Sequence, residues 1–239
     1  MPPPPHPPSA ASPETSVAEP LAASFGGVLL DLDGTLIDSI PAVVRSWVQW
    51  CGEYDVDPVR LTGFHGVTAS NVIAELLPEG RRAEAFARIR EIEVGDVEGI
   101  VLLPGAADLL AVLADGGVPT GIVTSGTSDL AEARIAATGL TRPAALVTAS
   151  DVERGKPWPD PWLEGARRLG VDPTDCVVVE DAVAGLRAAR AARCRALVAV
   201  LGTTPLEELV PEADLVVPDL AHLAASVEDG RVRVRAHGA

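Results

Sequence analysis

The chain contains few aromatic residues and few cysteines. Phe, Trp and Tyr together make up 3% of its 239 residues, whereas 47% of the residues are hydrophobic. The core must therefore be built mainly from Ala, Val and Leu. The three cysteines, Cys51, Cys176 and Cys194, form neither a C-x-x-C pair nor a cluster with metal-ligand spacing. We interpret them as reduced thiols and expect a reducing, cytoplasmic environment.

Positive charge and long apolar runs are also scarce. The formal net charge is −15, so the basic surface that nucleic-acid-binding proteins need is missing and no nucleic-acid partner is expected. No run of 18 apolar residues is present, and the first residues lack the basic start and apolar core of a signal peptide. We therefore expect neither a membrane span nor a membrane partner.

Lysine is nearly absent. Of the 19 basic residues only Lys156 is a lysine, and the others are arginines. A lysine kept in such a chain indicates a position that needs a compact point charge rather than a guanidinium fork. The alternative is the chance retention of a surface lysine.

Composition divides the chain into segments. Residues 1–24 are rich in Pro, Ala and Ser and are expected to form a disordered tail. Residues 41–100 show helical patterns without a strong strand signal, which predicts a helical module inserted after the first strand. Residues 226–239 are expected to form a C-terminal tail.

Residues 25–40 and 101–225 alternate between short apolar strands and helices. The expected strands are residues 28–30, 119–124, 145–148, 176–179, 196–201 and 215–217. This alternation predicts the α/β class with a doubly wound parallel sheet and right-handed crossovers.

The first strand runs directly into two carboxylates. Three apolar residues precede Asp31 and Asp33, and Gly34 supplies a turn. Asp31 and Asp33 are expected to share one site because the strand ends there, and ligands in open α/β sheets bind at the carboxyl ends of strands. An ordinary strand exit or a calcium-binding loop would give a similar pattern.

Polar groups follow the other strands as well. The full set is Asp31 and Asp33, Thr124 and Ser125, Lys156, and Glu180 and Asp181. Because the carboxyl ends of parallel strands share one edge, these groups are expected to converge. Several carboxylates around one point indicate a hard cation such as Mg²⁺, and a hydroxyl with backbone amides at a helix start suits phosphate.

Four motifs carry a resemblance to a known family. In chain order they are Asp31-Leu-Asp33-Gly-Thr, Thr124-Ser125-Gly, Gly155-Lys156-Pro-x-Pro-Asp160-Pro and Glu180-Asp181-Ala-x-Ala-Gly. Together they resemble the haloacid dehalogenase superfamily over about residues 25–225. The resemblance implies a Rossmann-like core, with residues 41–100 as its small helical cap.

The resemblance also implies roles for these residues. Asp31 would be the nucleophile that forms an aspartyl phosphate, and Asp33 the general acid and base. Mg²⁺ would be held by Asp31, the backbone carbonyl of Asp33 and Asp181, with Glu180 ordering the site.

The phosphoryl group would have its own contacts. Thr124 and the Ser125 amide would hold its oxygens, and Lys156 would neutralise negative charge.

The Asp-x-Asp pair resembles the phosphoryl-transfer branch rather than the dehalogenases. Hexose phosphomutases of this group carry a His that residues 40–44 lack, whereas residues 38–47 with Phe64-His65-Gly66 resemble sugar and polyol phosphatases. The implied activity is Mg²⁺-dependent hydrolysis of small sugar or polyol monophosphates. Open alternatives are another phosphomonoester (phosphoglycolate or a nucleotide), a β-phosphoglucomutase-like mutase, and a non-catalytic binding protein.

In the cap, His65 and Gly66 are expected to lie in a loop that faces the substrate, although His65 could be a surface residue. Arg45 could reach a substrate phosphate or only solvent. A site closed by its own insertion needs no second subunit, so we expect a monomer whose partner is a small phosphorylated metabolite.

Overall fold

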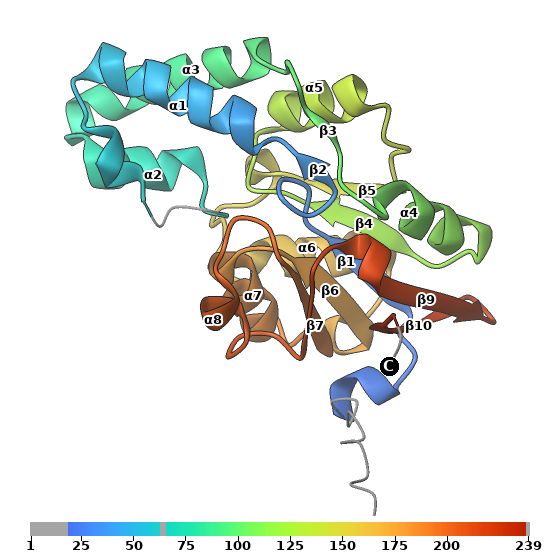
Figure 1. Cartoon of the computed structure of the whole chain (residues 1–239). Coiled ribbons are helices and arrows are strands. Elements are labelled where there is room, and N and C mark those ends of the chain that lie inside the picture. Colours follow the sequence, from blue (N-terminus) through green and yellow to red (C-terminus); the bar gives the residue numbers. More distant parts are fainter. Residues whose placement is uncertain (1–18, 63–65, 238–239) are drawn as a thin grey trace, which may run out of the picture.

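The computed structural model describes residues 19–62 and 66–237 (Figure 1). Its centre is a six-stranded parallel sheet in the order β5-β4-β1-β6-β7-β8. The strands are β1 (Gly27–Leu30), β4 (Thr120–Val123), β5 (Ala145–Val147), β6 (Cys176–Glu180), β7 (Ala196–Val200) and β8 (Leu215–Val217). The α/β class predicted from the sequence is confirmed.

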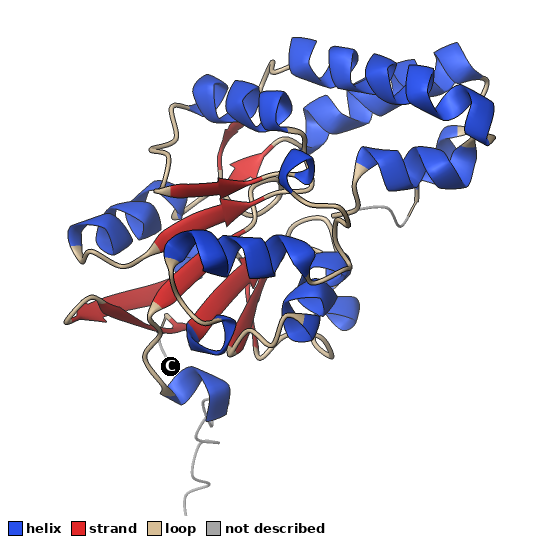
Figure 2. Cartoon of the chain, turned by 180° about the vertical axis from the view of Figure 1, so that it is seen from behind, coloured by secondary structure: helices blue, strands red, loops and turns tan. Residues whose placement is uncertain are grey.

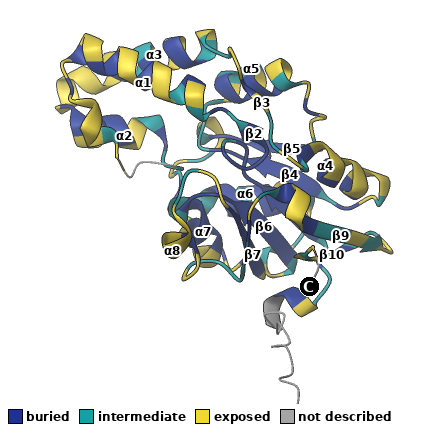
Figure 3. Ribbon diagram, in the orientation of Figure 1, coloured by how far each residue is buried: buried dark blue, intermediate teal, exposed yellow. Residues whose placement is uncertain are grey.

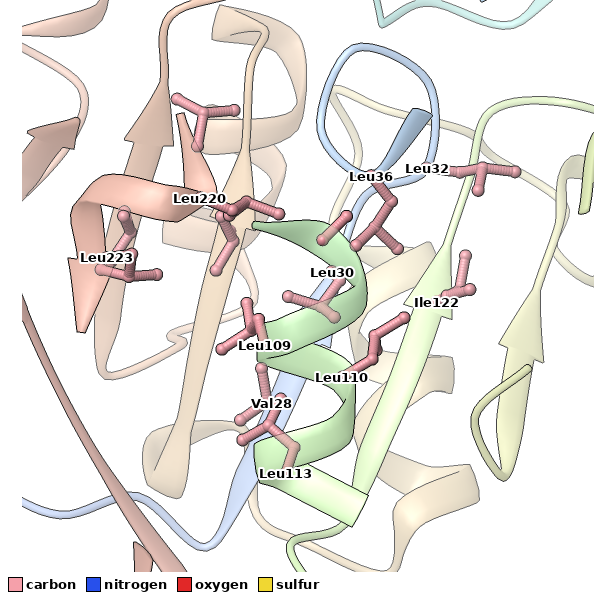
Figure 4. Packing of buried hydrophobic residues seen from close by; sticks show 14 of the residues in the cluster. Val28, Leu30, Leu32, Leu36, Leu109, Leu110, Leu113, Ile122, Leu220 and Leu223 are labelled. Carbon is pink, nitrogen blue, oxygen red and sulfur yellow. The ribbon is translucent and has the colours of Figure 1, made fainter. Parts of the chain in front are cut away.

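Helices cover both faces of the sheet (Figure 2). One face packs against α4 (Ala106–Asp115) and α5 (Ser128–Thr138), and the other against α6 (Asp160–Leu169), α7 (Val183–Ala191) and α8 (Leu206–Leu209). Alternate residues of each strand serve opposite faces. Val28 and Leu30 of β1 therefore join the first layer, where Leu109 and Leu113 of α4 pack on them (Figure 4), while Leu29 joins the second.

The inserted block is helical, as predicted. It contains α1 (Ile40–Tyr54), α2 (Ala69–Leu76) and α3 (Glu79–Gly95), which we call the cap. The cap has its own apolar core, in which Trp50 packs edge-to-face against Trp47 and stacks on Tyr54. Buried and exposed positions both occur along α1, as expected for a helix with one face in this core (Figure 3). Two short antiparallel strands, β2 (Ile37–Asp38) and β3 (Val101–Leu102), join it to the rest of the chain.

The C-terminal prediction was wrong. Residues 223–236 form a hairpin of β9 (Leu223–Glu228) and β10 (Arg231–Ala236), not a tail. The physical reason is visible in the sequence, because valines and arginines alternate with the period of a strand and Val232 and Val234 are buried. Asp229 and Gly230, both with positive φ, form the turn.

The N-terminal tail was predicted to reach residue 24, but the residues just before that point are already structured. Residues 1–18 lie outside the described residues, but Glu19–Ala22 form a short 3-10 helix and Leu21 is buried. Arg231 of β10 donates hydrogen bonds to Ser24. The other short 3-10 helices are Pro58–Leu61, Ala149–Asp151, Pro173–Asp175 and Leu220–His222. Within residues 19–62 and 66–237, no helix has the length and apolar character required to cross a membrane.

Candidate active site

The polar groups predicted to converge do lie together at one edge of the sheet. Asp31 and Asp33 follow β1, Thr124 and Ser125 follow β4, and Glu180 and Asp181 stand at the end of β6. Lys156 comes from the loop between the short helix after β5 and α6. Since β1 lies between β4 and β6, the first acid is flanked on both sides.

Lys156 is the centre of this arrangement and is fully buried. Its Nζ donates to Asp31 Oδ1 at 2.5 Å, to Glu180 Oε2 at 2.7 Å and to the Val123 carbonyl at 3.0 Å. The three ammonium protons therefore each have an acceptor. The Trp162 ring lies 4.6 Å from Nζ and adds a cation–π contact.

The acids around Lys156 resist ionisation. Burial raises the pKa of Asp31 well above its usual range, and the charge of Glu180 adds to this rise while Lys156 opposes it. Burial also raises the pKa of Glu180 to about 7, although the charge of Lys156 acts to lower it. Burial, followed by the charge of Asp31, raises the pKa of Asp181 to about 7. One ammonium does not balance three carboxylates in so dry a site.

The same three acids fit a hard divalent cation. Oxygen atoms of Asp31, Glu180 and Asp181 all lie within 4.8 Å of one another, and every side chain of the group is buried. All donors are oxygens, which Mg²⁺ prefers. Asp181 is held in place by the hydroxyl groups of Thr203, at 2.5 Å, and Thr35, at 3.4 Å.

Glu180 is already engaged on both carboxylate oxygens. Oε2 accepts from Lys156, while Oε1 accepts the backbone N–H groups of Asp181 at 3.3 Å and Ala182 at 3.2 Å. Glu180 thus contacts both Lys156 and the backbone of the turn after β6.

Asp33 belongs to a separate set of contacts. Its Oδ1 accepts from Ser39 Oγ and from Arg134 Nη1, both at 2.7 Å, and its Oδ2 accepts from Thr124 Oγ1 at 3.2 Å. Ser39 stands at the N-cap of α1, yet its hydroxyl bonds Asp33 rather than the helix. The two aspartates are thus held by different donors.

Gly34 allows the chain to turn between these two sets. Its φ is +88°, and a Cβ at this position would clash with the Asp181 carboxylate. The turn predicted from the sequence thus brings the backbone after Asp33 against the cation-binding residues.

The predicted phosphate-binding pair and the cap loop meet at one contact. Ser125 Oγ donates to the Gly66 carbonyl at 2.8 Å. Gly66 has a φ of +73°, and a Cβ there would lie 2.7 Å from Ala182 Cβ. The cap loop therefore rests on the segments after both β4 and β6. His65, the other predicted cap residue, lies outside the described residues.

Arg45 does not point to the site. Its guanidinium pairs with Asp96, with N···O distances of 2.9 and 2.8 Å, and also bonds the Glu98 carbonyl. It therefore ties α1 to the segment after α3.

Sequence reasoning missed Arg134 and its second partner, Glu93. Arg134 Nη2 lies 3.2 Å from Glu93 Oε1, and both side chains are buried. A signal was present, because both charged residues fall on the apolar stripe of their helices. Arg134 follows Leu130 by four positions, and Glu93 follows Ile89 by four.

The fold and the site together define a doubly wound α/β protein that has a helical cap and a candidate active site in which buried carboxylates surround one buried lysine. Residues 25–193 match the sequence model of haloacid dehalogenase-like hydrolases, and the chain belongs to this family. The resemblance carried by the four motifs is thereby confirmed.

Similarity to characterised proteins supports this family assignment. Hexitol phosphatase A of Escherichia coli is 42% identical over 204 residues, which cover 84% of this chain and 94% of that protein. Glycerol-1-phosphate phosphohydrolase 2 of Saccharomyces cerevisiae is 34% identical over 191 residues, or 74% of this chain and 75% of that protein. The crystal structure of CbbY from Rhodobacter sphaeroides, in complex with phosphate, has a TM-score of 0.72 at 26% identity and covers 82% of this chain and 95% of that one.

Proposed function

We propose that the protein is a Mg²⁺-dependent phosphatase that hydrolyses small sugar or polyol monophosphates through an aspartyl phosphate on Asp31. The observation that carries the proposal is that two aspartates two residues apart have different hydrogen-bond partners. Asp31 is bound by Lys156 inside the carboxylate cluster, whereas Asp33 is bound by Ser39, Arg134 and Thr124 outside it.

In the first half of the reaction a carboxylate oxygen of Asp31 attacks phosphorus. A new P–O bond forms, and the bond to the substrate oxygen breaks with its electron pair leaving on that oxygen. Asp33 donates a proton to this oxygen, which departs as an alcohol.

In the second half Asp33, now a carboxylate, takes a proton from water as that water attacks phosphorus. The P–O bond to Asp31 breaks, so that inorganic phosphate and the free Asp31 carboxylate result.

Charge must be neutralised throughout, because a phosphate dianion approaches a carboxylate. Lys156 supplies one fixed positive charge 2.5 Å from Asp31. Mg²⁺, held by Asp31, Asp181 and the backbone carbonyl of Asp33, would supply Lewis-acid stabilisation of the phosphoryl oxygens. The proposed contacts of Thr124 and the Ser125 amide would add directed hydrogen bonds.

The substrate class rests on the relatives. Two are named as phosphatases of hexitols and of glycerol 1-phosphate, and CbbY was crystallised with phosphate. Residues 40–44 at the start of α1 contain no His, which disfavours a mutase. The contact between Ser125 and Gly66 supports a small substrate, since the cap loop lies directly on the predicted phosphate-binding segment. His65 is proposed as a further contact from this loop.

The test is phosphate release from a panel of monophosphates, with and without Mg²⁺. We expect sorbitol 6-phosphate and glycerol 1-phosphate to be hydrolysed only with the metal. A preference for phosphoglycolate or a nucleotide by about tenfold in kcat/KM would replace the proposed substrate class, and no release from any member would favour a non-catalytic binding protein.

We also propose that the protein works as a monomer in the cytoplasm. The cap is an insertion in the same chain, so the site needs no second subunit to close it, and the three cysteines are buried free thiols. Light scattering at micromolar concentration should give a mass near 24.7 kDa; a stable dimer mass would overturn the monomer proposal.

A further inference from the structure

Arg134 stands between the proposed acid/base and the cap. Its Nη1 lies 2.7 Å from Asp33 Oδ1, and its Nη2 lies 3.2 Å from Glu93 Oε1 of α3. Its side chain is 5% exposed and that of Glu93 8%. One buried guanidinium thus links α5 of the core to a cap helix and to the reacting centre.

This arrangement is costly for the fold. Arg134 Nε is buried and has no hydrogen-bond partner within the described residues. A buried ion network with an unpaired N–H is commonly less stable than an apolar replacement of similar volume. Stability alone therefore does not account for a charged pair at these positions.

The contacts of Asp33 show what Arg134 does there. Oδ1 receives two short hydrogen bonds, from Arg134 and Ser39, while Oδ2 receives a single longer one from Thr124. The carboxyl group is thereby turned so that Oδ2 faces Thr124, the residue proposed to hold the phosphoryl group. Oδ1 is saturated, which leaves Oδ2 as the oxygen that can carry the transferred proton.

We propose that Arg134, anchored by Glu93 of the cap, is a positioning residue that orients Asp33 for protonation of the leaving group. This inference rests on the proposed phosphatase function. It predicts that Arg134 matters for substrates whose leaving group needs a proton and matters little for those whose leaving group does not.

The experiment compares two substrates in the full chain with Mg²⁺. Sorbitol 6-phosphate has an alkoxide leaving group that requires protonation, whereas p-nitrophenyl phosphate releases a stable anion. The value of kcat/KM reports the steps up to formation of the aspartyl phosphate, in which this proton is transferred. General acids increase the rate by about 10²–10⁴-fold, so a misplaced Asp33 should lose a substantial part of this rate increase.

Three variants make the comparison. Arg134→Met removes the contact, and Glu93→Leu/Arg134→Met also removes the unpaired acid that could prevent folding. Glu93→Gln keeps the volume and loosens the anchor. We expect a loss of about 30-fold or more with sorbitol 6-phosphate in the first two and about 3–10-fold in the third, with less than about threefold loss on p-nitrophenyl phosphate in all.

The matched control is Arg90→Gln. Arg90 and Asp129 form an exposed ion pair at 2.7 Å between the same two helices, without contacting Asp33. This variant should leave the ratio of the two kcat/KM values unchanged.

An equal loss on both substrates, or no loss, in the Arg134 and Glu93 variants would overturn the positioning role. Hydrolysis of neither substrate by the unmodified protein would instead overturn the proposed function, so the two failures are distinguishable.

Discussion

Lys156 Nζ lies 2.5 Å from Asp31 Oδ1, although the two residues are 125 positions apart in the chain. The contact exists because β1 occupies the middle of the sheet and the loop before α6 folds over the end of β4. The chain's one lysine therefore places its ammonium beside the proposed nucleophile, and a second acid, Glu180, also accepts a hydrogen bond from it.

Lys156→Met should damage both stability and activity. Asp31 and Glu180 would be left buried without a cation, and breaking a buried pair in this way typically costs about 3–5 kcal/mol. Loss of a fixed charge at a reacting centre typically costs about 10²–10³-fold in rate. Urea denaturation and phosphate release measure the two effects.

The control for Lys156→Met is the double variant with Glu180→Gln, which removes one stranded acid. It should recover part of the stability and none of the activity. Near-normal turnover by Lys156→Met would show that the ammonium has no role in the chemistry.

Gly34→Ala should displace the cation-binding residues. The new Cβ would collide with the Asp181 carboxylate, so we expect activity to fall by about tenfold or more, as expected when catalytic groups are misplaced by about 1 Å. Gly139→Ala is the matched control, because Gly139 has a φ of +65° and open space around its Cβ position. It should lose about 1 kcal/mol of stability and no activity. Equal activity in both variants would contradict the proposed role of the turn.

Much of the core could be predicted from the sequence because its signals are local. The apolar runs at 145–147 and 215–217 correspond to strands within a residue, since buried parallel strands need no pattern beyond continuous hydrophobicity. The convergence of Asp31, Lys156 and Asp181 was also predictable, because parallel strands carry their carboxyl ends to one edge.

The remaining features depend on contacts between distant segments. Ser39 stands at the N-cap of α1, and only the folded chain shows that its hydroxyl donates to Asp33 instead of capping the helix. The pairing of Arg134 with Glu93 depends on where α3 lies against α5, which no local pattern specifies. The hairpin at the C-terminus was missed for a different reason, since its alternation was visible but short.

Mg²⁺ should stabilise the folded protein, and this can be measured without turnover. A ligand at 100 times its Kd adds about 2.7 kcal/mol, which for a chain of this size corresponds to roughly 5–10 °C in Tm. Asp181→Asn removes one of the three clustered carboxylates and should lose most of this shift. If the Tm of both proteins rises equally with Mg²⁺, the ion binds elsewhere.

The buried thiols should be inert. Burial raises the pKa of Cys176 and of Cys194 to about 12, so at pH 8 only about one thiol in 10⁴ is ionised, against roughly a quarter for an exposed cysteine. Iodoacetamide at pH 8 should therefore label neither residue until urea unfolds the chain, as judged by mass spectrometry.

The same shift has a consequence for stability. A thiol whose pKa is raised on folding contributes stability below its unfolded pKa, near 8.5, and that contribution is lost as the pH rises toward 12. The free energy of unfolding should accordingly decline between pH 9 and 12, by less when both cysteines are replaced by Ala or Ser. Rapid labelling of the native protein would contradict the burial on which this rests.

The most direct test of the account is phosphate release by Asp31→Asn with sorbitol 6-phosphate and Mg²⁺. Asparagine has nearly the same shape as aspartate and cannot form the acyl phosphate, so we predict a fall in kcat of about 10⁴-fold or more with Tm changed by only a few degrees. Turnover by a folded Asp31→Asn protein at the rate of the unmodified chain would contradict the central claim that Asp31 is the nucleophile.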